Sequence, residues 1–139
     1  MDLKNKVIAI TGAGRGLGRS IAVNLASRGA KLALIDLNQE DLETTLTQVR
    51  EAGSEGKVYL CNVADESSVE TTFGAIPADL GGLNGLINNA GVTRDALFIK
   101  VKEGEIVSKM SMEQWNLVMD VNLTGTFLCG REAAVQMIQ

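Results

Sequence analysis

The sequence contains no histidine, one proline and only two cysteines, and these gaps exclude several kinds of chemistry. Histidine is the commonest metal ligand and proton carrier near neutral pH. Cys61 and Cys129 stand far apart without a CxxC pair. We therefore expect two buried, reduced thiols, no metal site and no disulfide.

Long hydrophobic runs and clusters of positive charge are also missing. No apolar segment approaches the length that crosses a membrane, and the N-terminus enters a strand-length apolar run without the pattern of a signal peptide. The net charge is −4, and the positive residues are scattered along the chain. The sequence predicts a cytoplasmic protein that binds neither membranes nor nucleic acids.

Glycine is abundant, with 15 residues, and its densest cluster lies between an apolar run and a helical pattern. The apolar run 7–10 is followed by TGAGRGLG at positions 11–18, so a strand feeds a glycine-rich turn that opens a helix. The first N–H groups of such a helix bind phosphate oxygens. A side chain at Gly12, Gly16 or Gly18 would hold a pyrophosphate away from the backbone. This segment predicts a dinucleotide-binding site.

Strands and helices alternate along the first part of the chain. Apolar runs predict strands at 7–10, 31–36, 58–62 and 86–88, and apolar residues at helical spacing predict a helix after each of the first three. Because the strands show no polar alternation, we expect an α/β fold with a doubly wound parallel sheet, the Rossmann fold, in one domain over residues 1–139.

Capping residues mark the ends of these helices. Gly29 and Gly53 are expected to end the first two helices, because a left-handed residue favours glycine there. Asn38 and Asp65 are expected to cap the second and third helices. Pro77 with the Gly81-Gly82 pair is expected to end the third.

The rest of the chain has a less regular pattern. Residues 92–110 mix charges with short apolar pieces and are predicted to form a loop. The segment 111–114, SMEQ, matches a capping box, and the apolar residues after it keep helical spacing. We expect two helical stretches that meet at Asn122.

Asp36 lies at the end of the second predicted strand, 20 positions after Gly16. A carboxylate there would accept hydrogen bonds from the adenosine ribose and repel a 2′-phosphate, which favours NAD over NADP. The alternative is that Asp36 caps the following helix. Arg15 could pair with a 2′-phosphate, contact the pyrophosphate or lie on the surface.

Four motifs in order resemble the short-chain dehydrogenase/reductase family: the glycine spacing at 11–18, NVAD at 62–65, NNAG at 88–91 and VNLTG at 121–125. The resemblance covers the whole chain. It implies that Asn62 and Val63 flank the adenine, that Asn89, Ala90 and Gly91 lie along the cofactor's ribose, and that the double Asn also ties the central strands together. The other expected cofactor-binding residues are Gly12, Arg15, Gly16, Leu17, Gly18 and Asp36.

Asn122 matches the family's asparagine whose main chain holds a water in the proton relay to the active-site lysine, and it is the catalytic residue expected in this chain. As a bare polar residue in a helix, it is equally expected to be a kink or an internal hydrogen-bond partner. The family's serine, tyrosine and lysine would lie beyond residue 139, so we expect a fragment that is inactive alone. Tyr59 cannot replace the tyrosine, because it lies in a strand and the residue four positions on is Val63.

Within the family, the segments that begin at Asn62 and Asn89 are most similar to the 3-oxoacyl-[acyl-carrier-protein] reductases, which makes an acyl thioester a candidate substrate. Two features depart from those reductases. Asp36 suits NAD, whereas they mostly use NADPH, and residues 98–110 form a longer connection near the substrate entrance.

The resemblance implies an NAD(P)-dependent oxidoreductase that transfers hydride between the nicotinamide and a secondary alcohol or ketone. It also implies a homodimer or homotetramer packed through the last helices. The residues that could form this contact, or could equally belong to the core, are Leu123, Phe127 and Val135. The alternative function is a catalytically inactive nucleotide-binding or interaction module.

Overall fold

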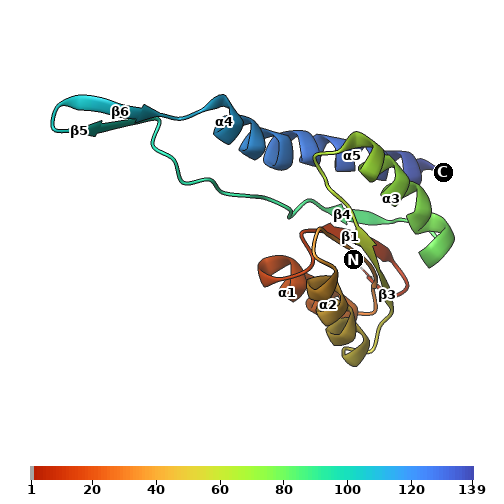
Figure 1. The fold of residues 1–139 in the computed structure, drawn as a ribbon. Coiled ribbons are helices and arrows are strands. Elements are labelled where there is room, and N and C mark those ends of the chain that lie inside the picture. Colours follow the sequence, from red (N-terminus) through yellow and green to blue (C-terminus); the bar gives the residue numbers. More distant parts are fainter. Residues whose placement is uncertain (1) are drawn as a thin grey trace.

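The computed structural model describes residues 2–139 and shows helices on both faces of a four-stranded parallel sheet (Figure 1). The strand order is β3-β2-β1-β4. The strands are β1 Val7–Thr11, β2 Lys31–Asp36, β3 Gly56–Leu60 and β4 Gly85–Ile87, and the helices are α1 Gly16–Ser27, α2 Gln39–Glu51, α3 Glu66–Leu80, α4 Met112–Met119 and α5 Gly125–Ile138. The predicted doubly wound α/β fold is confirmed.

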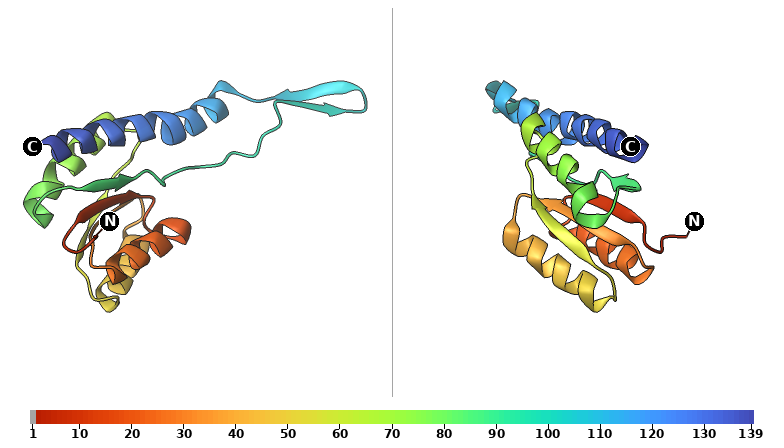
Figure 2. Two further views of the ribbon diagram at one scale, coloured as in Figure 1. Left: turned by 180° about the vertical axis from the view of Figure 1, so that it is seen from behind. Right: turned by 90° about the vertical axis from the view of Figure 1, so that its right-hand side faces the viewer.

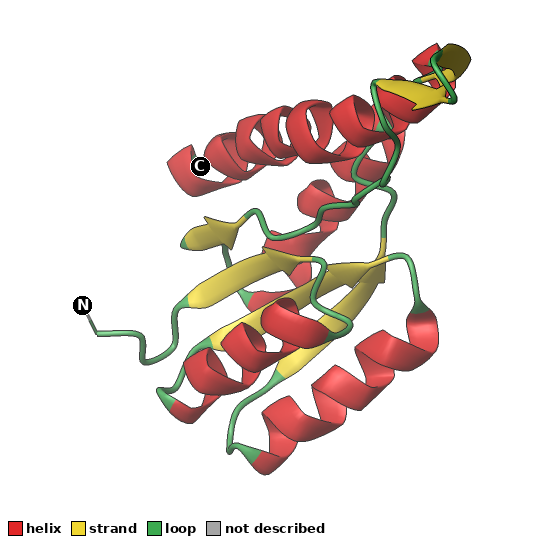
Figure 3. Ribbon diagram, turned by 90° about the vertical axis from the view of Figure 1, so that its left-hand side faces the viewer, coloured by secondary structure: helices red, strands yellow, loops and turns green. Residues whose placement is uncertain are grey.

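Two hydrophobic cores lie on the two faces of this sheet, and alternate residues of one strand serve both. In β1, Ile8 and Ile10 belong to the core formed with α1 and α2, whereas Val7 and Ala9 belong to the core formed with α3 and α5. Figures 2 and 3 show the two helix pairs on opposite sides of the strands. Burial on both faces explains why the strands carry no polar alternation.

The predicted helix caps are confirmed. The side chain of Asn38 accepts a hydrogen bond from the Asp41 N–H at the start of α2, and Asp65 accepts one from the Ser68 N–H at the start of α3. Gly29 and Gly53 follow α1 and α2 with φ of +86° and +88°, in the left-handed region.

The prediction that Pro77 helps to end the third helix is wrong. Pro77 lies inside α3, which continues to Leu80 and ends at Gly81, a left-handed cap with φ of +89°. Proline lacks one backbone donor but keeps a φ that a helix accepts, so the last turn can form around it.

The third and fourth strands begin earlier than the sequence predicts. Strand β3 is Gly56–Leu60 rather than 58–62, and β4 is Gly85–Ile87 rather than 86–88. Gly56 pairs with Leu32 of β2, and a Cβ on Gly56 would lie 2.7 Å from the Leu32 carbonyl oxygen. Glycines therefore begin both strands, where a search for apolar runs does not find them.

The prediction of a loop over residues 92–110 is wrong in part, because an antiparallel hairpin lies within it. Its strands are β5 Ile99–Lys102 and β6 Glu105–Lys109. The two turn residues, Glu103 and Gly104, have φ of +51° and +84°, the combination that a tight hairpin turn requires. The hairpin stands away from the sheet (Figures 1 and 2), and all its strand residues are exposed.

The helical stretch after the hairpin follows the prediction closely. Ser111 and Gln114 form both hydrogen bonds of a capping box at the start of α4. A short π-helix, η1 Asp120–Thr124, joins α4 to α5 around Asn122. Leu123 and Phe127 are 60% and 61% exposed, so they do not belong to the core of the described residues.

Cys61 and Cys129 are both free and buried, as predicted. Burial raises the pKa of the Cys129 thiol to about 12, which keeps it protonated near neutral pH. In residues 2–139, no helix is both long enough and apolar enough to cross a membrane.

Candidate functional site

A cavity of about 440 Å³ lies at the carboxyl ends of β1, β2 and β4, where doubly wound sheets bind their ligands. Six of the predicted cofactor-binding residues line it: Gly12, Arg15, Asp36, Asn89, Ala90 and Gly91. The fold thus brings together three segments that are far apart in the sequence. Among residues 2–139, no cluster of three or more His, Cys, Asp or Glu is arranged to hold a metal ion.

The three glycines of the predicted motif differ in what surrounds them. A Cβ on Gly18 would lie 2.0 Å from the Gly12 carbonyl oxygen, and a Cβ on Gly12 would lie 2.9 Å from Ala90 Cα. These two glycines therefore allow close packing of α1 and of the segment after β4 against the loop. Only Gly16, with φ of +55°, would direct a Cβ into open space. Gly12 and Gly18 thus have a packing role in the fold, and the expectation that all three glycines let a pyrophosphate approach the backbone stays a prediction.

The first turn of α1 has no side-chain cap. The N-cap residue is Arg15, whose side chain makes no capping hydrogen bond to the helix. By contrast, the side chains of Asn38, Asp65 and Ser111 cap α2, α3 and α4. The helix begins with Gly16, Leu17 and Gly18. The N–H groups of an uncapped first turn are free to bind an anion.

The carboxylate of Asp36 is held at the wall of the cavity. Its Oδ2 accepts a hydrogen bond from the Gly14 N–H at 2.9 Å, and its Oδ1 accepts one from the Leu37 N–H at 2.7 Å. The N-cap of α2 is Asn38, so the alternative that Asp36 caps this helix is wrong. The bonds to Gly14 and Leu37 fix the carboxylate beside the glycine-rich loop.

Thr11 and Asn89 tie β1 to the segment after β4. The hydroxyl of Thr11, which is 1% exposed, accepts hydrogen bonds from the N–H groups of Asn89 and Ala90, both at 3.0 Å. The Asn89 amide donates to the carbonyl oxygens of Thr11 and Gly12 at 3.1 and 3.0 Å. These bonds set the wall formed by Ala90 and Gly91 against the glycine-rich loop.

Asn62 and Val63 do not line this cavity. The side chain of Asn62 accepts a hydrogen bond from the Ala64 N–H and stabilises the turn after β3. Val63 is buried in the core with α3 and α5, where its Cγ2 would lie 2.9 Å from a Cβ on Gly125. Their expected position beside the adenine stays a prediction.

Asn122 is an internal hydrogen-bond partner and lies at an irregularity of the helix. Its amide donates to the Val92 carbonyl oxygen at 2.9 Å and accepts from the Val92 N–H at 2.8 Å. The π-helix η1 therefore connects to the segment that follows Gly91. The expected role of Asn122 in a proton relay stays a prediction.

Five cavity residues were not predicted: Leu37, Asn38, Asp41, Val92 and Val121. Leu37 is 70% exposed. A large apolar residue directly after Asp36, at the end of a strand, was the available signal for it. Val92 and Val121 reach the cavity because Asn122 holds their segments together. No local sequence pattern predicts that contact.

Tyr59 is held in a structural hydrogen bond, as its strand position suggests. Its hydroxyl donates to Asp79 Oδ2 at 2.9 Å, and burial together with this bond raises the pKa of Tyr59 above its usual value. Asp79 in turn pairs with Lys57 at 2.7 Å, which lowers the pKa of the Asp79 carboxyl. Tyr59 is therefore poorly placed to give up a proton.

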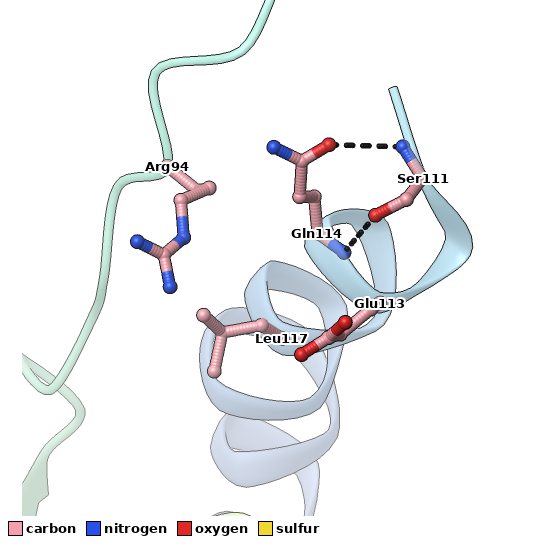
Figure 4. A pocket seen from close by; sticks show the side chains of 5 residues that line it. All are labelled: Arg94, Ser111, Glu113, Gln114 and Leu117. Carbon is pink, nitrogen blue, oxygen red and sulfur yellow. Dashed lines mark hydrogen bonds between the residues drawn. The ribbon is translucent and has the colours of Figure 1, made fainter. Parts of the chain in front are cut away.

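A second cavity, of about 610 Å³, lies between the segment after β4 and the start of α4 (Figure 4). Its lining residues are Arg94, Ser111, Glu113, Gln114 and Leu117. Ser111 and Gln114 are occupied with each other in the capping box. None of the predicted cofactor-binding residues lines it, so we assign the site to the first cavity.

Comparison with known proteins places this geometry in a family. The model of the short chain dehydrogenases matches residues 6–139. The 3-oxoacyl-[acyl-carrier-protein] reductase of Staphylococcus aureus is 35% identical over 135 residues, 96% of this chain and 51% of that protein. The D-threitol dehydrogenase of Mycolicibacterium smegmatis is 33% identical over 99% of this chain and 49% of its own.

A solved structure gives the same result. NAD+-bound xylitol dehydrogenase superposes with a TM-score of 0.85 at 33% identity, over 99% of this chain and 50% of its own. The chain spans about half the length of the curated relatives that it matches. The chain belongs to the short chain dehydrogenase family.

Proposed function

We propose that this chain is the cofactor-binding part of an NAD-dependent oxidoreductase that transfers hydride between the nicotinamide and a secondary alcohol or ketone. The observation that carries the proposal is the single cavity where the glycine-rich loop, the Asp36 carboxylate and the wall of Asn89, Ala90 and Gly91 meet. The names of the relatives, two dehydrogenases and a reductase, support the reaction class.

The residues of the cavity fit the adenosine and pyrophosphate part of a dinucleotide. The uncapped first turn of α1, from Gly16 to Gly18, would bind the phosphate oxygens. Asp36 would accept hydrogen bonds from the ribose hydroxyls of the adenosine, and Asn89, Ala90 and Gly91 would lie along the cofactor's ribose. When bound, the nicotinamide supplies or accepts the hydride, and the protein contributes its position and the surrounding charge.

Two further roles are proposed on the family resemblance. Asn62 and Val63 lie beside the adenine, at the end of the third strand. Asn122 holds a water through its main chain, while its side chain keeps Val92 in place.

The protein acts as a homo-oligomer through the exposed apolar residues of α5.

The proposal predicts that Asp36 sets the preference for NADH over NADPH. Asp36→Asn keeps an acceptor for the Gly14 N–H but removes the charge that repels a 2′-phosphate. We expect the dissociation constant for NADPH divided by that for NADH to fall about tenfold. A tenfold change corresponds to the usual free energy of a hydrogen bond to a charged group. Fluorescence titration of the protein with NADH and with NADPH measures this ratio.

Glu40→Gln is the matched control, because it removes the same charge from an exposed position near the start of α2 that does not line the cavity. Its ratio is expected to equal that of the unaltered protein. No binding of either dinucleotide to the unaltered protein would refute the proposed function, and an equal ratio for Asp36→Asn would refute the role of Asp36.

The substrate class is tested separately. We propose a 3-oxoacyl thioester, because the segments that begin at Asn62 and Asn89 are most similar to the 3-oxoacyl-[acyl-carrier-protein] reductases. Absorbance at 340 nm, followed with NADH and a short 3-oxoacyl thioester and with NAD and a sugar alcohol such as xylitol, separates the two chemistries. Turnover of the sugar alcohol but not of the thioester would show that the substrate is a sugar alcohol and not an acyl thioester. The assay uses the longer protein whose cofactor-binding part we propose this chain to be, because the chain alone is expected to be inactive. Dinucleotide binding by that protein without turnover of either compound would favour the alternative of a nucleotide-binding module.

A further inference from the structure

Thr45 is a fully buried polar residue on the face of α2 that packs against the sheet. Three carbonyl oxygens lie within reach of its single hydroxyl proton: Ala13 at 2.9 Å and Gly14 at 3.1 Å, both in the glycine-rich loop, and Asp41 at 3.1 Å within α2. The same hydroxyl accepts a hydrogen bond from Arg19 Nε at 3.0 Å. A buried hydroxyl with these partners links α2 to the back of the loop.

Arg19 reaches the same carbonyl from α1. Its Nη2 donates to the Gly14 carbonyl oxygen and, at 3.3 Å, to that of Asp41, whose carboxylate lies 3.6 Å from Nη2. Side chains of two helices thus converge on one peptide group. We call this pair of side chains the Arg19–Thr45 brace.

The brace fixes the directions of two N–H groups on the other side of the loop. All peptide bonds of the described residues are trans, and in a trans peptide the C=O and the following N–H point in opposite directions. Because the Ala13 carbonyl faces Thr45, the Gly14 N–H faces away from it and donates to Asp36. Because the Gly14 carbonyl faces the brace, the Arg15 N–H is directed away from it, on the side where Arg15 lines the cavity.

We propose that Thr45 and Arg19 are positioning residues for the cofactor site, which orient the Gly14 and Arg15 N–H groups and, through Gly14, the Asp36 carboxylate. Neither residue lines the cavity, so both act through the loop. The inference rests on the proposed dinucleotide binding and adds two residues to its machinery.

Thr45→Val tests the brace, because valine keeps the shape of threonine and loses the hydroxyl. We expect about fivefold weaker NADH binding by fluorescence titration, the weight of roughly one hydrogen bond. Thr45→Ser, which keeps the hydroxyl, is expected to restore nearly the original affinity. Arg19→Met removes the other half of the brace and is expected to weaken binding in the same way.

Thr44→Val and Thr47→Val are matched controls on the same helix. Their hydroxyls donate to the carbonyl oxygens of Glu40 and Glu43 within α2, both at 3.0 Å, and do not reach the loop. Both are expected to bind NADH as the unaltered protein does. All titrations are made at a temperature where thermal unfolding curves show every variant folded, so that a lost affinity is not lost structure.

Amide hydrogen exchange of the loop gives a readout that needs no ligand. Peptides that cover residues 12–16 are expected to exchange faster in Thr45→Val than in Thr44→Val, because the loop loses the hydroxyl that orients the Gly14 N–H towards Asp36. Equal exchange and equal NADH affinity in these two variants would overturn the brace. If the unaltered protein binds no NADH, the proposed function fails, and the exchange comparison still decides whether the brace orders the loop.

Discussion

At the scale of single residues, two glycines that lie within helices differ in what surrounds them. Gly18 has no room for a Cβ because the Gly12 carbonyl oxygen lies 2.0 Å from where it would be. Gly74, in the middle of α3, would meet nothing within 4 Å. The glycine-rich motif singles out Gly18, but the neighbour that excludes a side chain there, the Gly12 carbonyl oxygen, is brought close only by the turn itself.

We predict opposite effects for alanine at these two positions. Gly18→Ala must shift the loop and is expected to lower the free energy of unfolding by about 1–3 kcal/mol, as overpacking does. Gly74→Ala is expected to raise it by about 0.5–1 kcal/mol, because alanine is the better helix former. Urea denaturation of both variants measures the two changes. A stable Gly18→Ala protein would mean that α1 does not pack against the loop as described.

The residues of the site were predictable where the chemistry is local. Gly12 and Asn89 come shortly after a strand and Asp36 is the last residue of one, and parallel strands bring their carboxyl ends to one edge. Thr45 was not predictable as part of this machinery, because a threonine among Leu42, Leu46 and Val49 reads as one position of a buried helix face. Its partners, Ala13 and Gly14, lie 32 and 31 positions away in the sequence, and only the fold joins them.

At the scale of elements, the β5–β6 hairpin is a separate unit. Its strand residues are exposed, including Val101 at 59% and Ile106 at 65%, and it contributes no residue to either hydrophobic core. Its ends are adjacent, because the Met110 N–H donates to the Phe98 carbonyl oxygen at 3.0 Å. The body of the fold therefore does not depend on it.

We predict that the hairpin can be removed without loss of the core fold. Replacement of residues 99–109 by two glycines is expected to change the free energy of unfolding by no more than about 0.5 kcal/mol, as for other surface changes. NADH affinity is expected to stay the same. Urea denaturation and fluorescence titration of the shortened protein check both statements. A clear loss of stability would show that the hairpin packs against the body.

Element prediction succeeded where burial fixes the pattern and failed where it does not. The apolar run of β2, buried on both faces, gives its observed ends, Lys31 and Asp36. The hairpin strands are exposed and carry a register irregularity between Lys100 and Val101, so neither strand shows a clean alternation. The one sequence signal for the hairpin was Gly104 in its turn, where both Glu103 and Gly104 take a positive φ.

At the scale of the whole molecule, the described residues leave two surfaces without a partner. In residues 2–139, β4 pairs with β1 only and forms one edge of the sheet. On α5 and the turn before it, Leu123 is 60% exposed, Phe127 61% and Val135 41%. Large contiguous patches of exposed apolar residues mark contact surfaces in proteins, whereas single exposed apolar residues are common. Within residues 2–139 the three side chains lie outside both hydrophobic cores, and their contact with a second copy of the protein stays a prediction.

We predict that these residues drive self-association of the protein. Leu123→Glu and Phe127→Glu each place a charge where the contact would exclude water, and either change is expected to weaken association by about tenfold or more. Sedimentation velocity over a range of protein concentrations measures it. Ile106→Glu is the matched control, because Ile106 is equally exposed, at 65%, but lies on the hairpin. If Ile106→Glu dissociates the assembly and Phe127→Glu does not, the hairpin and not α5 forms the contact. If the unaltered protein stays monomeric at every concentration, the exposed residues of α5 serve another purpose.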